Sequence, residues 1–436
     1  MQTNHSFFVT LRLKSRRDSV TLRKIQKKMK KFILPILLLT ALFSSCHHHD
    51  DLSKVIPVAN RTVLVYISGE NTLSPYIKSE LSELREGSKG IGNNHLVVYV
   101  DAADKTQMPY LIRIEEGVTV DSIAFDHDPI SSDPAAMLDI LTQVSTYYPG
   151  KDYGLVLWGH ASGWLLEDSV SSASLSRPLR GYGIDNGKNE GVIGKGADIG
   201  AWINMNTLAK VLKTWNMPIS FIFADCCQFQ CIESAYELRH CAKYIIGSPA
   251  EIPGVGAPYR SITKALFYQN ADFYSDIAKR YFEQIVDGCR VPISVIKCSE
   301  LDNLAAATNK ILHTFAASMG TNPNMSGRIY YKGSITKPIE NVMYDMNDFM
   351  LHESAPGDYD DWKQAFNKCV VVQLAANKWI TNNQVNFNTF TVNKTTYGGV
   401  SMYVPQQRPG SSYDKYNSDI KKTSWYQAIQ AKDFNW

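Results

Sequence analysis

Short apolar runs alternate with polar, helix-like segments along the first half of this sequence. Four runs rich in Val, Ile, Leu, Phe and Tyr are typical of buried strands: residues 62–67, 96–100, 153–158 and 219–223. Segments with apolar residues at helical spacing lie between them and predict helices at residues 75–86, 134–148 and 206–215. Strands that alternate with helices predict an α/β fold with a largely parallel sheet and helices on both faces.

The C-terminal third has a weaker pattern. It favours helices at residues 271–286 and 302–317 and strands at residues 292–296 and 399–404. We find no internal repeat and no linker that divides this part of the chain. We therefore predict one domain over residues 59–436, with a core at about 59–300 and a C-terminal α+β extension at about 301–436.

A long glycine-rich stretch separates two of the predicted strands. Residues 161–200 contain eight glycines, together with Lys188 and Lys195. Connections longer than roughly 12 to 15 residues are usually functional or mobile. We interpret this stretch as a lid, a processing loop or both.

The N-terminal residues carry an export pattern. Lys30 and Lys31 precede an apolar run at residues 32–43, and two serines then precede Cys46. The run is shorter than the roughly 20 residues of a membrane-spanning helix, which favours a signal peptide over a retained anchor. The segment resembles a lipoprotein signal. We predict a basic leader and signal peptide at residues 1–45, a lipidated Cys46, and a polar tether through residue 58.

That leader also changes the meaning of the net charge. Residues 1–31 contain ten Lys or Arg and one Asp, a net charge of +9, whereas the whole chain has +3, so the remainder has −6. The rest of the chain has no excess of positive charge that would indicate a nucleic-acid partner. We expect a monomeric, exported bacterial lipoprotein of the cell envelope, with the outer membrane favoured, facing the periplasm or the exterior.

Cysteine spacing leaves a metal-binding alternative open. Seven cysteines follow Cys46, and an odd number in an exported protein leaves at least one thiol unpaired. Four of them crowd into residues 226–241 with spacing C-C-x3-C-x9-C, which lacks the paired C-x2-C pattern of a zinc site. A metal-binding module of Cys226, Cys231 and Cys241 is therefore a weaker hypothesis.

Two predicted strand ends hold the candidate chemistry. One ends in Gly159-His160 and the other in Asp225-Cys226-Cys227. Loops at the carboxyl ends of parallel strands converge, so His160 could act as a base for a cysteine thiol. Side chains alternate along an extended segment, which puts Asp225 and Cys227 on one side and Cys226 on the other. Asp225 would attract a basic substrate side chain, and a helix expected at residues 232–238 would favour the thiolate through its dipole.

These residues resemble conserved blocks of the clostripain family of cysteine peptidases, which has a caspase-like fold. LVLWGHASGW at 155–164 is similar to its His-Gly-Gly-Gly-Trp block, and DCCQFQCIESAYEL at 225–238 to its Asp-x-Cys block. Weaker similarities follow in family order: TVLVYISGENTL at 62–73, SPAEIPGVGAPY at 248–259, YDMNDFM at 344–350 and GGVSMYVP at 398–405.

The resemblance implies a three-layer α/β/α sandwich and cleavage of peptides or proteins after Arg or Lys. It places the base on His160, the nucleophile on Cys227 and the basic-side-chain pocket on Asp225. It further implies an oxyanion hole formed by backbone N–H groups at Ala161 and Cys227. Members of the family can depend on calcium, and some are activated by cleavage after a basic residue, for which Lys188 and Lys195 are the candidates here.

The departures from the family pattern keep a non-enzymatic alternative open. Ala161 and Ser162 stand where the family has glycines. A surface lipoprotein that keeps the fold, has lost activity, and binds a protein or a glycan is therefore the main competing hypothesis.

Overall fold

The computed structural model describes residues 56–104, 106–166, 181–187, 200–319, 323–332, 342–382, 386–407 and 413–434. The chain divides into two units, Met1–Ile56 and Pro57–Trp436, and the elements below belong to the second. Within the described residues, no helix combines the length and the apolar character needed to cross a membrane.

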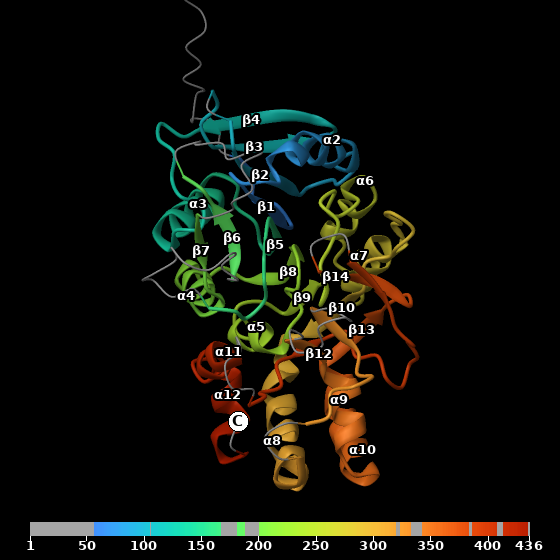
Figure 1. Ribbon diagram of the computed structural model, residues 1–436. Helices are drawn as coiled ribbons and strands as arrows, with labels where there is room; N and C mark the ends of the chain where they lie inside the picture. The colour runs from blue at the N-terminus through green and yellow to red at the C-terminus, as the bar shows by residue number, and fades with distance from the viewer. Residues whose placement is uncertain are drawn as a thin grey trace, which may run out of the picture. The chain divides into compact units, whose positions relative to one another are not determined.

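A nine-stranded sheet in the order β13-β10-β9-β8-β5-β1-β2-β3-β4 organises the fold (Figure 1). The pairs from β9 through β8, β5 and β1 to β2 are parallel, and the two strands at each edge run antiparallel to their neighbours. The strands are β1 (Thr62–Gly69), β2 (His95–Ala102), β3 (Tyr110–Glu115), β4 (Val118–Ala124), β5 (Tyr153–Trp158), β8 (Ile219–Asp225), β9 (Tyr244–Gly247), β10 (Ile293–Lys297) and β13 (Val370–Leu374).

Helices cover both faces of this sheet, which explains why its central strands are apolar throughout. All residues of β1, β5 and β8 are buried. Side chains of α2 (Ile77–Gly87), α6 (Tyr259–Ile262) and α7 (Phe273–Glu283) pack in one hydrophobic core with β1, β2 and β10. Figure 1 shows α3 (Pro134–Tyr147) and α4 (Met205–Trp215) on the opposite face. The predicted α/β sandwich with a largely parallel sheet is confirmed.

The hairpin of β3 and β4 at one edge of the sheet was not predicted. Its turn is formed by Glu116 and Gly117, both with positive φ, 48° and 88°. The residues of β4 are mostly exposed, so its sequence lacks the continuous apolar run that marks a buried strand. The Glu-Gly pair between two β-branched segments is the signal that could have revealed it.

The C-terminal part adds helices and a small sheet beside the main one. Its described elements are α8 (Leu301–Met319), α9 (Met346–Glu353), α10 (Pro356–Cys369), α11 (Tyr413–Ile420), α12 (Ser424–Ala428) and the three-stranded sheet of β11 (Tyr330–Lys332), β12 (Met343–Asp345) and β16 (Ser401–Met402). Two further pairs, β14 (Lys378–Asn382) with β15 (Asn386–Thr389) and β6 (Tyr182–Asp185) with β7 (Ala201–Ile203), complete the strands.

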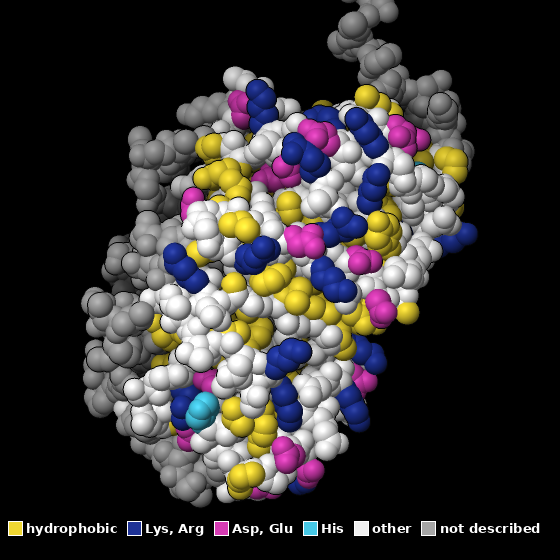
Figure 2. All heavy atoms as spheres, turned by 90° about the vertical axis from the view of Figure 1, so that its right-hand side faces the viewer, with side chains coloured by type: hydrophobic (Ala, Val, Ile, Leu, Met, Phe, Trp, Pro, Cys, Tyr) yellow, Lys and Arg dark blue, Asp and Glu magenta, His cyan; other side chains and the backbone are white. Residues whose placement is uncertain are grey.

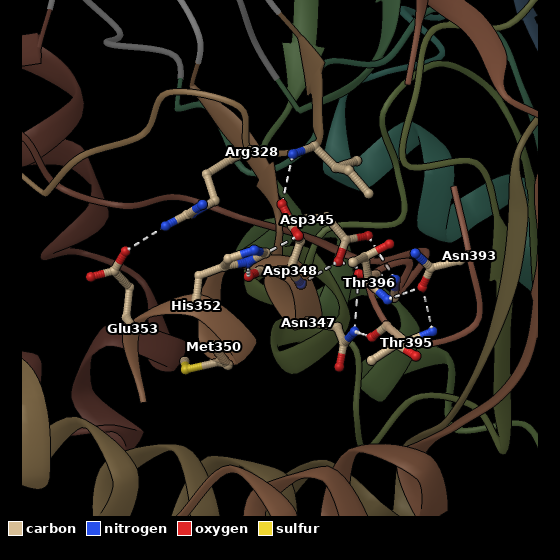
Figure 3. Close-up of polar contacts among 12 residues, drawn as sticks. Arg328, Asp345, Asn347, Asp348, Met350, His352, Glu353, Asn393, Thr395 and Thr396 are labelled. Carbon is tan, nitrogen blue, oxygen red and sulfur yellow. Dashed lines mark hydrogen bonds and ion pairs between the residues drawn. The ribbon is translucent and has the colours of Figure 1, made fainter. Parts of the chain in front are cut away.

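A buried carboxylate ties α9 to the segment that precedes β16 (Figure 3). Asp345 caps the helix by accepting a hydrogen bond from the Asp348 N–H at 2.9 Å. It also accepts the N–H groups of Gly398 and Gly399, at 2.9 and 3.0 Å. Burial raises the pKa of Asp345 to about 6. These bonds satisfy a carboxylate that would otherwise be costly to bury, and they fix the glycine pair beside the main sheet.

Charged side chains of both signs are mixed on the outside of the protein. Figure 2 shows Lys and Arg side chains close to Asp and Glu side chains across the face that it presents. On the described part of this face, charges of the two signs are interspersed.

Candidate active site

A pocket opens at the carboxyl ends of the central parallel strands. The residues that line it are Leu73, Trp158, Gly159, His160, Asp225, Cys227, Ile252, Pro253, Gly254 and Gly256. Trp158 at the end of β5 pairs with Asp225 at the end of β8, so the residues that follow the two strands emerge side by side. The structure thus brings together His160, Asp225 and Cys227, which the sequence analysis selected from the two strand ends.

His160 is held by polar contacts on both its ring and its backbone. Its Nε2 lies 3.0 Å from the Oγ1 of Thr72, just beyond β1, and its carbonyl accepts the Gly183 N–H at 2.8 Å. Sequence reasoning nominated no residue to orient this imidazole. The signal for Thr72 was a hydroxyl just beyond a third buried strand, in the segment SGENTL.

Cys227 is a half-buried thiol whose hydrogen-bond partners within the described residues are backbone groups. Its Sγ accepts the Ile252 N–H at 3.4 Å and lies 3.9 Å from the Ile252 carbonyl oxygen. Burial is the largest cause that raises its pKa to about 12, and the charge of Glu251 adds to it. The thiol is therefore protonated at neutral pH, and a base must remove its proton before it can attack.

The helix that follows Cys227 begins where the sequence predicted. The helix α5 (Ile232–Glu237) has Cys231 as its N-cap residue. Before it, the chain makes a turn at Gln228, which has a φ of 56°. The effect of the helix dipole on the Cys227 thiolate stays a prediction.

Asp225 lines the pocket with a carboxylate that three hydrogen-bond donors hold in place. Its Oδ2 accepts the Ala257 N–H at 3.0 Å and the Tyr259 hydroxyl at 2.8 Å, and its Oδ1 accepts the Tyr281 hydroxyl at 3.2 Å. Burial raises the pKa of Asp225 to about 6, and the three donors act against that rise. At neutral pH the group is mainly ionised, so it provides a negative charge in a largely apolar pocket.

Gly256 keeps the space above this carboxylate open. A Cβ at this position would lie 2.8 Å from the Oδ2 of Asp225 and 3.3 Å from the Nε1 of Trp158. The φ of Gly256 is +60°, a conformation that glycine adopts without cost. Both observations explain why this position is a glycine.

The other cysteines of the 226–241 segment do not converge on a metal. Cys226 is fully buried, the Sγ of Cys231 lies 3.0 Å from the Ser234 hydroxyl, and the Cys241 Sγ lies 3.6 Å from the Ala209 carbonyl. Within the described part of the chain, the cluster of three or more potential metal ligands is made of carboxylates instead. The seven cysteines of this part are free thiols.

Other candidate residues lie apart from the pocket or outside the description. Ala161 is buried, and its backbone pairs with Tyr182 of β6, while Gly159 rather than Ala161 lines the pocket. Cys46, Lys188 and Lys195 lie outside the described residues. Their suggested roles stay predictions.

The ends of the central parallel strands bring a cysteine thiol, an imidazole and a buried carboxylate to one pocket, an arrangement compatible with a cysteine peptidase. The chain belongs to the clostripain family of C11 peptidases, because the sequence model of this family matches residues 65–436. The resemblance noted in the sequence is thus confirmed.

Solved structures of C11 proteases share this fold. A secreted C11 cysteine protease from Bacteroides thetaiotaomicron, in complex with an irreversible peptide inhibitor, is 29% identical with a TM-score of 0.68, over 86% of this chain and 100% of that one. An inactive zymogen C11 protease from Parabacteroides distasonis is also 29% identical, with a TM-score of 0.68, over 86% and 99% of the two chains. Comparison with curated proteins gave no match.

Proposed function

We propose that the protein is a lipid-anchored endopeptidase that cleaves after Arg or Lys, with His160 as base and Cys227 as nucleophile. The observation that carries this proposal is that His160, Cys227 and Asp225 line one pocket. The raised pKa of the thiol adds a reason why a base is needed beside it.

The proposed reaction proceeds in two stages. His160 accepts the thiol proton, and the Sγ of Cys227 attacks the carbonyl carbon of the scissile bond. The tetrahedral intermediate collapses to a thioester as its C–N bond breaks, and His160 returns the proton to the leaving amine. Water, deprotonated by His160, then hydrolyses the thioester and regenerates the thiol. Backbone N–H groups at Ala161 and Cys227 are the proposed oxyanion donors.

Asp225 is the proposed determinant of specificity. A carboxylate held by three donors loses little freedom when it pairs with a guanidinium or ammonium group. An Arg or Lys side chain next to the scissile bond would reach it through the space that Gly256 leaves open.

The direct test is cleavage of matched reporter peptides with Arg, Lys or norleucine before the scissile bond. We expect cleavage after Arg and Lys and little after norleucine. Equal cleavage of all three would contradict the proposed pocket. Absence of cleavage, together with no labelling of Cys227 by a peptide-based alkylating probe, would favour the alternative of an inactive surface lipoprotein that binds a protein or a glycan.

Thr72→Val is expected to lower kcat by about 3- to 10-fold, because the imidazole of His160 loses the hydrogen bond that orients it. Val matches the shape of Thr, so KM should change little. The matched control is Thr72→Ser, which keeps the hydroxyl and should restore most of kcat. Equal losses in both variants, measured with the Arg reporter, would indicate a packing role for Thr72 and contradict a positioning role.

We further propose that Cys46 carries the lipid anchor and that cleavage after Lys188 or Lys195 activates the enzyme. The Parabacteroides distasonis relative is described as an inactive zymogen, which supports a precursor form in this family. We expect mass spectrometry of the active protein to find two polypeptides, with new termini after one of the two lysines. An active protein that consists of a single intact chain would contradict the proposed processing.

A further inference from the structure

A lysine from the C-terminal extension reaches the segment that carries the candidate nucleophile. Lys332 is the last residue of β11, and its Nζ donates a hydrogen bond to the Gln228 Oε1 at 2.9 Å. Gln228 follows Cys227 directly in the chain and is 4% exposed, and Lys332 is half-buried. The contact therefore brings a cation from a distant segment to the immediate neighbour of Cys227, largely shielded from solvent.

This contact also fixes a turn of unusual backbone conformation. Gln228 has a φ of 56°, which residues other than glycine rarely adopt. Its N–H donates to the Ala250 carbonyl at 2.8 Å, so its backbone and its side chain are both held. Because Lys332 would lose its bond to this fixed amide if it turned toward bulk water, its charge stays beside the Cys227 segment.

Charges of both signs act on the Cys227 thiol. Burial is the largest cause that raises the pKa of Cys227 to about 12; the charge of Glu251 adds to this rise, and the charge of Lys332 opposes it. Burial in turn lowers the pKa of Lys332 to about 8, against the opposing charges of Glu251 and Cys227. At neutral pH the lysine is therefore mainly protonated and can stabilise a negative charge on the sulfur.

The other titratable groups around the thiol supply no permanent positive charge. Asp225 raises the pKa of the thiol, and burial raises the pKa values of Cys226 and Tyr281 well above their usual range, so both are neutral at pH 7. His160 lines the same pocket and, as the proposed base, becomes positive only after it has taken the proton. Among the described residues whose charges act on the thiol, Lys332 is therefore the cation.

We propose that Lys332 is a positioning residue whose ammonium group favours the thiolate form of Cys227, a role that rests on Cys227 being the nucleophile of the proposed function. The proton passes from the Sγ to His160, while the ammonium group keeps its own proton and stabilises the charge that develops on the sulfur. This interaction is stronger in half-buried surroundings than in bulk water. The C-terminal extension would thus act on a pocket whose lining residues all lie between Leu73 and Gly256.

The test measures alkylation of Cys227 in the full chain by iodoacetamide, a small neutral reagent, with the modified peptide quantified by mass spectrometry. Lys332→Met should slow this alkylation at pH 7 by at least about 3-fold. A thiol pKa higher by about one leaves about tenfold less thiolate, and the greater nucleophilicity of the more basic thiolate recovers about threefold of that loss.

The pH dependence separates an effect of charge from an effect of packing. Lys332 has its charge below a pH of about 8 and loses it as pH rises through this value. The ratio of the parent rate to the Lys332→Met rate should therefore fall toward one above a pH of about 8. A packing role would give a ratio that does not follow this titration. Lys332→Arg keeps its charge throughout this range, so it should keep most of the rate at pH 7 and show no such fall in its own ratio to Lys332→Met.

Two further variants serve as controls. Glu251→Gln removes the opposing charge and should speed alkylation. Lys310→Met removes an exposed lysine that pairs with Asp361 on the surface, and its rate should equal that of the parent.

The proposal is overturned if Lys332→Met alkylates as fast as the parent at pH 7, or if the ratio of the two rates stays constant as pH rises through about 8. It is also overturned if Cys227 of the parent is not alkylated at all. Alkylation needs no substrate peptide, so a parent that depends on Lys332 in this assay but cleaves no reporter would contradict the proposed peptidase function alone.

Discussion

Cys227→Ala is expected to abolish peptide cleavage, with kcat lowered at least about 10⁴-fold, because no other group can form the thioester. The substitution removes one half-buried sulfur whose partners are the backbone groups of Ile252, so the fold should persist. Cleavage of the Arg reporter, combined with the melting temperature of the variant, separates a loss of chemistry from a loss of structure.

The neighbouring cysteine provides the matched control. Cys226 is fully buried and does not line the pocket, so Cys226→Ala should keep its kcat and lose at most about 1–2 kcal/mol of unfolding free energy through lost packing. Loss of activity in Cys226→Ala with retention in Cys227→Ala would overturn the assignment of the nucleophile.

Asp225→Asn is expected to lower kcat/KM for the Arg reporter by about 10²- to 10³-fold, because a buried charge pair with the substrate is lost. The amide retains one oxygen as an acceptor for Ala257 or for a tyrosine hydroxyl, and hydroxyl groups can rotate, so the pocket should keep its shape. The norleucine reporter serves as an internal control and should change far less.

The same carboxylate gives a pH signature. The pKa of Asp225 is raised to about 6, so the group gains a proton as pH falls through this value and its charge is lost. The ratio of kcat/KM for the Arg reporter to that for the norleucine reporter should therefore fall below a pH of about 6. Taking the ratio cancels the pH dependence of the steps that both reporters share. In Asp225→Asn this ratio should not change with pH. If the ratio still falls below a pH of about 6 in this variant, Asp225 is not the source of specificity.

The sequence predicted the centre of the fold better than its edges. Central strands such as β5 are buried on both faces, so their continuous apolar runs are visible without any tertiary information. The edge strand β4 is mostly exposed, and β9 has only four residues, so neither gives a strong pattern. The order of strands and helices along the chain also does not reveal that the strands at the two edges run antiparallel to their neighbours.

Candidate site residues could be predicted where a reactive side chain directly follows a predicted strand. His160 and Cys227 could be proposed from the sequence because His and Cys are uncommon residue types at two such positions, and the structure places both at one pocket. Thr72 was not proposed, because a hydroxyl after a strand is common and only the folded geometry places it 3.0 Å from the imidazole. Lys332 was missed for a related reason: it lies 104 residues after Gln228 in the chain, and only the fold brings the two side chains together.

The free cysteines determine whether the protein can refold after it has unfolded under oxidising conditions. Six of the seven described cysteines are buried and none is bonded to another. The native packing shields six of these sulfurs from solvent, whereas an unfolded molecule would expose all seven to random disulfide formation. Unfolding would then be irreversible outside a reducing environment. In such an environment the lifetime of the protein would be set by its unfolding rate, rather than by the equilibrium between its folded and unfolded forms.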